Sequence, residues 1–271
     1  MTNDREQGKA REDLKMAMEA YARENLAVAF SGGVDSSLLL HLACAYAKNP
    51  SSVHAVILKT MLQTEEEVQK AREAAIEMGA TAWVLSVDDW EEAGILDNPP
   101  ERCYLCKKHM FQRLREHMVE HGVTVILEGT NADDLQVYRP GIRAIRELGI
   151  KSPLAEAGVT KETVRAMAQE YGIGSAKKPS TPCLATRFPY GTRLTREKLR
   201  MAELGEAYLN SLGMGNVRLR VHGEIARIEV DPKDFSVLVK NREDVASHLK
   251  ELGYRYVTLD LQGFRSGSMD E

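Results

Sequence analysis

Two of the four cysteines in the chain, Cys103 and Cys106, are separated by two residues in the stretch "ERCYLCKKHM". Thiolates at this spacing can hold zinc, act as a redox dithiol or ligate an iron–sulfur cluster. The polar N-terminus "MTNDREQGKARED" lacks the apolar core of a signal peptide, so we expect a reducing, cytoplasmic location. In that environment a C-x-x-C pair is expected to bind a metal or to take part in catalysis.

The other two cysteines differ in their surroundings. Cys183 lies in "PSTPCLATRFPYGT", where prolines predict an irregular loop, whereas Cys44 lies among apolar residues and is expected to pack in the core. His109 follows Cys106 at helical spacing, so it could complete a zinc site of three cysteines and one histidine. A persulfide relay from the C-x-x-C pair through Cys183 is a further alternative.

A second candidate site is the stretch "AFSGGVDSSLLL", which follows an apolar run and opens a helical one. Paired glycines allow a tight turn, and a helix N-terminus flanked by hydroxyl side chains can bind phosphate. An aspartate in the first helical turn can hold Mg²⁺ beside that phosphate. The residues expected to bind ATP here are Ser31, Gly32, Gly33, Asp35, Ser36 and Ser37, with Asp35 as the Mg²⁺ ligand.

The S-G-G-x-D-S-S pattern resembles the PP-loop of the ATP pyrophosphatase superfamily, and it lacks the lysine of a Walker loop. The resemblance implies that ATP is split between its α- and β-phosphates, with transfer of AMP to a substrate oxygen. The stretch "EGTNADDLQVYRPG" places Gly129 and Thr130 where such sheets bind ligands, and both are expected to contact ATP. Asp133 and Asp134 fit either metal binding or a solvated acidic loop.

Hydrophobic periodicity predicts the elements that position these residues. Apolar runs predict strands at residues 26–30, 53–58, 81–87 and 123–129, with helices between them. Such alternation is typical of an α/β fold with a parallel sheet covered on both faces. We assign residues 1–180 to a PP-loop ATP pyrophosphatase domain, which the resemblance implies is adenine nucleotide alpha hydrolase-like.

After about residue 185 the predicted order changes to helix, two strands, helix and strand. We assign residues 181–271 to a smaller C-terminal α+β domain with an antiparallel sheet, for substrate binding and oligomerisation. In the strand "VRLRVH", Arg218, Arg220 and His222 alternate with apolar residues and therefore share one face. Such a face can bind phosphate and carboxylate groups, or it can simply face solvent.

Three stretches, "CLATRFPYGT", "VRLRVHGEIARIEV" and "YVTLDLQGFRSGSM", together with the PP-loop, resemble the LarE family over nearly the whole chain. Members are ATP-dependent sulfur transferases of nickel-pincer nucleotide cofactor biosynthesis. The resemblance implies adenylation of a carboxylate of pyridinium-3,5-biscarboxylic acid mononucleotide and its conversion to a thiocarboxylate. It also implies a homo-oligomer, specifically a hexamer, and substrate binding by Arg187, Glu206, Arg218 and Arg220.

In the best-known type of this family, one cysteine in the segment that matches Cys183 gives up its own sulfur. The additional Cys103 and Cys106 indicate instead the variant in which three cysteines hold a 4Fe-4S cluster, with Cys183 as the third ligand. One iron then lacks a protein ligand and can carry the sulfide that is transferred. All three cysteines are therefore candidate catalytic residues.

Other functions fit parts of the sequence. A PP-loop tRNA thiolase can also use three cysteines, but a net charge of −4 gives no sign of a nucleic-acid surface, so no nucleic-acid partner is expected. An amide-forming ligase of the NAD synthetase sort would leave the cysteines unused. A nucleotide-sensing protein would bind ATP without releasing pyrophosphate. Because no apolar run is long enough to span a bilayer, no membrane partner is expected.

Overall fold

The computed structural model describes residues 2–60, 65–137, 139–177, 183–265 and 267–269, and the chain divides into two compact units. The first unit comprises Met1–Gly94 and Glu101–Ser180, and the second comprises Ile95–Pro100 and Thr181–Glu271. The domain boundary expected at residues 180 and 181 lies outside the described residues. Each unit has its own sheet and is considered by itself below.

The short segment Ile95–Pro100 belongs to the second unit although it interrupts the first unit in sequence. Its backbone and side chains are bonded to the segment around residue 190. Leu194 N donates to Leu96 O at 2.7 Å, and Asn98 Nδ2 donates to the carbonyls of Phe188 and Pro189 at 3.0 and 2.8 Å. The composition of the sequence does not indicate that Ile95–Pro100 belongs to the second unit.

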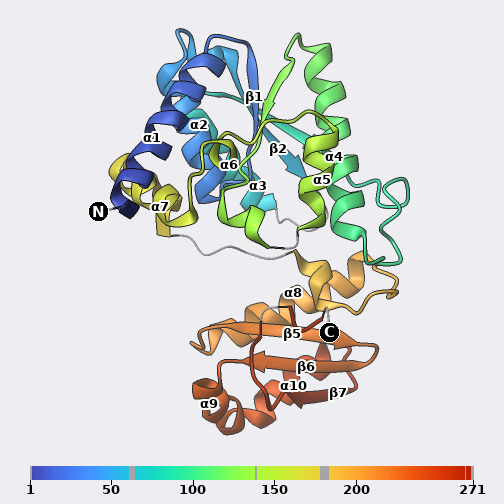
Figure 1. Ribbon diagram of the computed structural model, residues 1–271. Helices are drawn as coiled ribbons and strands as arrows, with labels where there is room; N and C mark the ends of the chain where they lie inside the picture. The colour runs from blue at the N-terminus through green and yellow to red at the C-terminus, as the bar shows by residue number, and fades with distance from the viewer. Residues whose placement is uncertain (1, 61–64, 138, 178–182, 266, 270–271) are drawn as a thin grey trace. The chain divides into compact units, whose positions relative to one another are not determined.

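A four-stranded parallel sheet forms the centre of the first unit (Figure 1). Its strands are β1 (Leu26–Ala29), β2 (Val53–Lys59), β3 (Thr81–Ser86) and β4 (Val125–Leu127). They lie in the order β3-β2-β1-β4. Near-continuous apolar runs form the central strands because helices cover both faces of the sheet.

The helices of the first unit are α1 (Thr2–Tyr21), α2 (Val34–Tyr46), α3 (Glu65–Glu77), α4 (Arg102–Glu120), α5 (Pro140–Glu147), α6 (Pro153–Glu156) and α7 (Lys161–Glu170). Alternate strand residues point to different helices: Leu26 packs in a cluster with Leu38 of α2, whereas Ala27 packs with Leu114 of α4. In Figure 1, α4 and α5 lie across the sheet from α1, α2 and α7. The predicted α/β fold is confirmed.

None of the helices within the described ranges combines the length and apolar character that crossing a bilayer would require.

The strand order changes direction at β1, which has β2 on one side and β4 on the other. In open parallel sheets, ligands bind outside the carboxyl ends of the strands at such a switch point. The segment after β1 leads into α2, and the segment after β4 leads into the short helix η2 (Asp133–Gln136). Both segments therefore lie at the edge of the sheet where ATP was expected.

The second unit contains α8 (Arg196–Ser211), β5 (Val217–His222), β6 (Ile225–Val230), α9 (Phe235–Lys240), α10 (Arg242–Glu251) and β7 (Tyr256–Leu259). Its sheet has the order β5-β6-β7. The first pair is antiparallel, but β6 and β7 are parallel. The prediction of an antiparallel sheet is therefore wrong for β7, because α9 and α10 return the chain to the starting end of β6.

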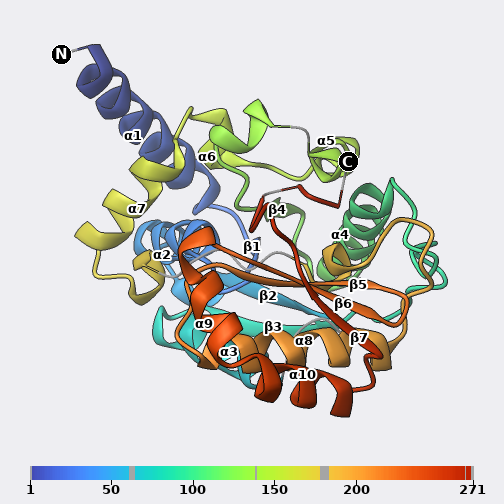
Figure 2. The ribbon, with the colours of Figure 1, turned by 90° about the horizontal axis from the view of Figure 1, so that it is seen from below.

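Gly205 allows α8 to lie very close to its neighbours in the second unit. Figure 2 shows α8 and α10 along the small sheet. A Cβ added at Gly205 would lie 2.5 Å from Leu219 Cδ2 of β5 and 3.0 Å from Leu249 Cδ2 of α10. The absence of a side chain at this position is thus a packing requirement.

We predict that Gly205→Ala lowers the free energy of unfolding by about 1–3 kcal/mol, because overpacking outweighs the better helix propensity of alanine. Gly8→Ala is the matched control, since a Cβ at this exposed position of α1 meets nothing within 4 Å. The control should raise stability by about 0.4–1 kcal/mol. Urea denaturation followed by circular dichroism measures the free energy of unfolding of both variants. A similar change in the two variants would contradict the close packing of α8 at Gly205.

Candidate active site

The loop between β1 and α2 forms a cradle of backbone and hydroxyl groups at the carboxyl edge of the parallel sheet. Gly32 has a φ of +70°, which residues with a Cβ rarely adopt, and Gly33 caps α2 with an extended backbone. Ser36 Oγ donates to Gly33 O at 3.1 Å and lies 3.2 Å from Ser31 Oγ. Ser37 lies buried beneath the loop.

The N-terminus of α2 provides the positive end of this cradle. The first N–H groups of a helix have no partner within the helix, and the helix dipole adds partial positive charge at the same end. A loop of glycines and serines in front of such a helix is suited to bind a phosphate group. Ser31, Gly32, Gly33 and Ser36 thus lie where the predicted ATP phosphates would be held.

Asp35 lies in the first turn of α2, and its carboxylate interacts with two other segments of the first unit. Lys161 Nζ, at the start of α7, forms an ion pair with Asp35 Oδ2. Asn131 Nδ2, from the segment after β4, donates to Asp35 Oδ1 at 3.2 Å. The Asp35 side chain keeps 20% of its surface exposed, so its oxygens remain accessible to a hard cation such as Mg²⁺.

Asp133 and Asp134, which follow β4, form hydrogen bonds that fix the conformation of this loop. Asn131 Oδ1 accepts hydrogen bonds from the backbone N–H groups of Asp133 and Asp134, at 3.0 and 3.2 Å. Asp134 Oδ2 accepts from Asn131 N, and Asp133 Oδ2 accepts from Lys161 N at 2.8 Å. The two carboxylates therefore hold Asn131 and the start of α7 in place around Asp35.

Gly129 and Thr130 connect β4 to this loop. A Cβ at Gly129 would lie 3.1 Å from both Asp35 Cβ and Ser36 N, so the backbone here lies directly against the first turn of α2. Thr130 donates from its N–H and its hydroxyl to the buried Glu128 carboxylate, at 3.0 and 2.8 Å. The Thr130 hydroxyl is thus already engaged, whereas the close backbone approach at Gly129 borders the cradle.

Cys103 and Cys106 lie in the first turns of α4, where their spacing places both thiols on one side of the helix. Cys103 is exposed and Cys106 is partly exposed. Arg102 Nη2 lies 3.8 Å from Cys103 Sγ. Cys44, by contrast, is buried in α2, and burial raises the pKa of its thiol to about 11.

The cysteine-bearing turn of α4 is fixed against α5. Tyr104 Oη donates to Glu147 Oε2 of α5 at 2.7 Å, and Lys108 and Arg143 donate to the same carboxylate. The hydrogen bond from Tyr104, followed by those from Arg143 and Lys108, lowers the pKa of Glu147 to about 2. A Cβ at Gly141 would lie 2.7 Å from Lys107 Cδ, so the two helices also approach closely.

Cys183 belongs to the second unit and precedes the short helix η4 (Leu184–Arg187). Its side chain is exposed, whereas its carbonyl accepts from Thr186 N, Thr186 Oγ1 and Arg187 Nη1 at 3.0, 2.7 and 3.3 Å. The buried Arg187 guanidinium forms two hydrogen bonds with Glu206, and Glu206 also accepts from Leu219 N at 2.9 Å. Arg187 and Glu206 therefore tie the Cys183 segment to β5.

The predicted basic face of β5 is present, and it surrounds a buried carboxylate. Glu229 of β6 is fully buried, and it accepts from Arg220 Nε at 2.9 Å and from Arg227 Nη2 at 3.0 Å. Ser268 Oγ donates to the same carboxylate at 2.7 Å. The C-terminal segment thus covers part of this face, which does not simply face solvent.

Arg218 differs from the other arginines of this face. Within the described ranges it has no carboxylate at ion-pair distance, and its Nη1 donates to its own backbone carbonyl. The Phe264 ring centroid lies 5.4 Å from its guanidinium carbon. Burial, followed by the neighbouring Arg187 charge, lowers the pKa of Arg218. A bound anion would relieve the cost of this partly buried positive charge.

Sequence reasoning did not single out Lys161 or Glu128, and it did not predict the burial of Glu229. Each has a sequence signal. Lys161 directly follows Thr160, whose side chain caps α7, and each glutamate interrupts or ends an apolar strand run. A charged residue in such a run is expected to have a buried partner.

A phosphate cradle between the first strand and helix of a parallel sheet, with an aspartate in the first helical turn, defines a PP-loop enzyme that uses ATP. Residues 9–167 match the family model described as asparagine synthase. The whole chain has a more specific affiliation. It is 39% identical over 248 residues to the pyridinium-3,5-bisthiocarboxylic acid mononucleotide synthase of Lactiplantibacillus plantarum. The matched residues make up 92% of this chain and 90% of that protein. The chain therefore belongs to the LarE family.

Two further relatives are also similar to the chain. An uncharacterized protein of Synechocystis is 35% identical over 246 residues, which are 90% of this chain and 91% of that protein. The NH(3)-dependent NAD(+) synthetase of Mannheimia succiniciproducens is 27% identical over 176 residues, which are 60% of this chain and 68% of that protein. Similarity to the synthetase is thus weaker and covers less of the chain than similarity to the mononucleotide synthase.

Proposed function

We propose that this protein is an ATP-dependent sulfur transferase that converts a carboxylate of pyridinium-3,5-biscarboxylic acid mononucleotide into a thiocarboxylate. The observation that carries the proposal is the cradle around Asp35, in a chain similar along nearly its full length to a synthase of the corresponding bisthiocarboxylic acid mononucleotide. The cradle supplies what ATP requires, namely phosphate-binding backbone groups and an accessible oxygen ligand for Mg²⁺.

In the proposed first step, a substrate carboxylate oxygen attacks the α-phosphorus of ATP, and pyrophosphate leaves. The α2 N-terminus and the hydroxyls of Ser31 and Ser36 would hold the phosphates, and Asp35 would hold Mg²⁺. Binding of Mg²⁺ by Asp35 would release the Lys161 ammonium from its ion pair with this carboxylate. The released ammonium would then be free to pair with a phosphate and to stabilise negative charge on the leaving group.

In the proposed second step, a sulfide sulfur attacks the acyl carbon, and AMP leaves with the former carboxylate oxygen. We propose Cys103, Cys106 and Cys183 as ligands of a 4Fe-4S cluster. The donor set fits, because thiolates are the usual ligands and the side chains of all three are at least partly exposed. A cluster held by three thiolates would supply one iron at which the transferred sulfide can be held.

We assign Arg218 to binding the anionic groups of the mononucleotide, because its charge is the least compensated on the basic face of β5. Arg187, Glu206 and Arg220 shape the same region through their buried ion pairs. The homo-oligomeric state, expected to be a hexamer, stays a prediction, as does the cytoplasmic location.

We predict that Asp35→Ala and Gly33→Val each abolish pyrophosphate release while the circular dichroism spectrum stays native. The first change removes the proposed Mg²⁺ ligand, and the second places a branched side chain, whose Cβ would lie 3.3 Å from Ser31 Oγ, in the phosphate cradle. Asp13→Ala, on the exposed side of α1, is the control and should release pyrophosphate normally. Pyrophosphate release by either cradle variant would rule out this ATP site.

The role of Arg218 predicts a selective loss of affinity. Arg218→Ala should weaken binding of the mononucleotide about tenfold to a hundredfold, since a charged hydrogen bond contributes about 1.5–3 kcal/mol, and it should leave ATP affinity unchanged. Arg200→Ala, an exposed arginine on α8, should change neither affinity. Calorimetric titration measures both ligands, and an equal loss for both would show that Arg218 does not recognise the substrate.

The cysteine assignment predicts that anaerobically reconstituted protein binds about four irons and four sulfides. Replacing any one of the three proposed ligands by alanine should abolish both the cluster and sulfur transfer but preserve ATP binding; these variants are Cys103→Ala, Cys106→Ala and Cys183→Ala. Cys44→Ala should preserve the cluster, sulfur transfer and ATP binding. Iron and sulfide analysis and product assays provide the measurement.

Two outcomes would contradict the cluster. A colourless protein whose bound zinc requires the three cysteines as well as His109 would indicate a zinc site of three cysteines and one histidine. Full activity of Cys103→Ala and Cys106→Ala, with loss of hydrogen sulfide mass from Cys183 after one turnover, would indicate that Cys183 is the sacrificial sulfur donor.

A further inference from the structure

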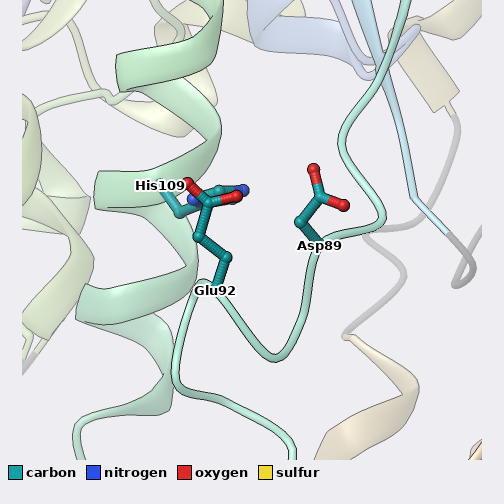
Figure 3. A group of neighbouring side chains, drawn as sticks. All are labelled: Asp89, Glu92 and His109. Carbon is teal, nitrogen blue, oxygen red and sulfur yellow. The ribbon is translucent and has the colours of Figure 1, made fainter.

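Three side chains of types that can bind a metal ion converge in the first unit, none of them part of the ATP cradle described above. Ligand atoms of Asp89, Glu92 and His109 all lie within 4.8 Å of one another. Figure 3 shows the His109 ring and the Glu92 carboxylate side by side, with the Asp89 carboxylate across from them. Among the described residues, no other group of three or more histidine, cysteine, aspartate or glutamate ligands meets this distance within the unit.

His109 provides an independent reason to expect a ligand here. The residue is only 9% exposed, and its Nε2 atom is buried without a hydrogen-bond partner among the described residues. Buried polar atoms in native proteins almost always have a partner. A metal ion bound by this imidazole would satisfy the nitrogen, because imidazole is a common ligand of divalent transition metals.

Both sides of the group are held by ordered structure. Asp89 and Glu92 lie in the turn after β3, where Ala93 N donates to Asp89 O at 2.8 Å and brings the two carboxylates to one side of the turn. Buried Trp90 anchors the same turn. His109 lies on α4, whose Leu114 packs in the core beneath the sheet. The ligands therefore need little reorganisation to bind an ion.

The charges also favour a cation. Neither Asp89 nor Glu92 forms an ion pair with a lysine or arginine in the described part of the chain, although both carboxylates lie beside the histidine. Two carboxylates and one imidazole form a mixed oxygen and nitrogen set. Mg²⁺ and Ca²⁺ prefer oxygen ligands alone, whereas Mn²⁺ and Zn²⁺ accept such mixed sets.

We propose that Asp89, Glu92 and His109 form a site for a first-row divalent transition-metal ion, separate from the Mg²⁺ ligand Asp35. Bound there, the ion connects the turn after β3 to α4 at His109, which lies three residues, about one helical turn, beyond Cys106. The site leaves coordination positions for water and goes beyond the proposed sulfur transfer, which does not require it.

Titration of the nucleotide-free full-length protein with Mn²⁺, followed by pulsed electron paramagnetic resonance, tests this site. We expect about one bound Mn²⁺ with a directly coordinated imidazole nitrogen, a feature that an all-oxygen site at Asp35 would not produce. His109→Ala should remove the nitrogen coupling. Glu92→Gln, a change of an exposed side chain that leaves the core intact, should weaken Mn²⁺ binding at least about tenfold.

His117→Ala, on the same helix, is the matched control and should retain the coupling, as should Cys103→Ser. Absence of nitrogen-coupled Mn²⁺ in the natural sequence, or persistence of the coupling in His109→Ala, would overturn the proposal. Loss of the coupling in Cys103→Ser would also overturn it, because His109 would then belong to a cysteine-containing site.

Discussion

The candidate active site depends on the close approach of the backbone at Gly129 to the first turn of α2. A Cβ at this position would lie 3.1 Å from Asp35 Cβ and from Ser36 N, so a larger residue would have to displace the first turn of α2. The approach follows from the parallel pairing of β1 and β4, which ends both strands at the same edge. It brings Asn131 and, through Asp133, the start of α7 to Asp35. Without it, Asp35 would lose its hydrogen bond from Asn131, and Asp133 would no longer hold the start of α7 near it.

The second unit is organised by two buried carboxylates. Glu206 holds Arg187 and the backbone of β5, and Glu229 holds Arg220 and Arg227. Removing one member of such a pair would leave a buried charge, at a cost of about 3–5 kcal/mol. Arg187, Arg220 and Arg227 are therefore committed to the structure of this unit. Arg218 has no such ion pair within the described residues, and the proposed recognition of the substrate rests on it.

Much of the fold follows from local patterns, whereas the site depends on contacts between distant segments. Apolar runs located β1–β4 because buried strands require them, and period two placed Arg218 and Arg220 on one face. The parallel β7 was not predicted, since strand direction depends on the path of the connecting helices. The Asp35–Lys161 pair joins residues 126 positions apart, and nothing local indicates it. The sequence also did not indicate that Ser268 would donate a hydrogen bond to Glu229.

The central claim is that the cradle around Asp35 transfers AMP to a substrate carboxylate before sulfur replaces an oxygen. Labelling the carboxylate oxygens of the mononucleotide with oxygen-18 and analysing the released AMP by mass spectrometry tests this order directly. The account predicts that AMP formed together with the thiocarboxylate carries one oxygen-18 atom, because the acyl–oxygen bond breaks when sulfide attacks. Unlabelled AMP, with the label released in phosphate or water, would contradict adenylation of the carboxylate.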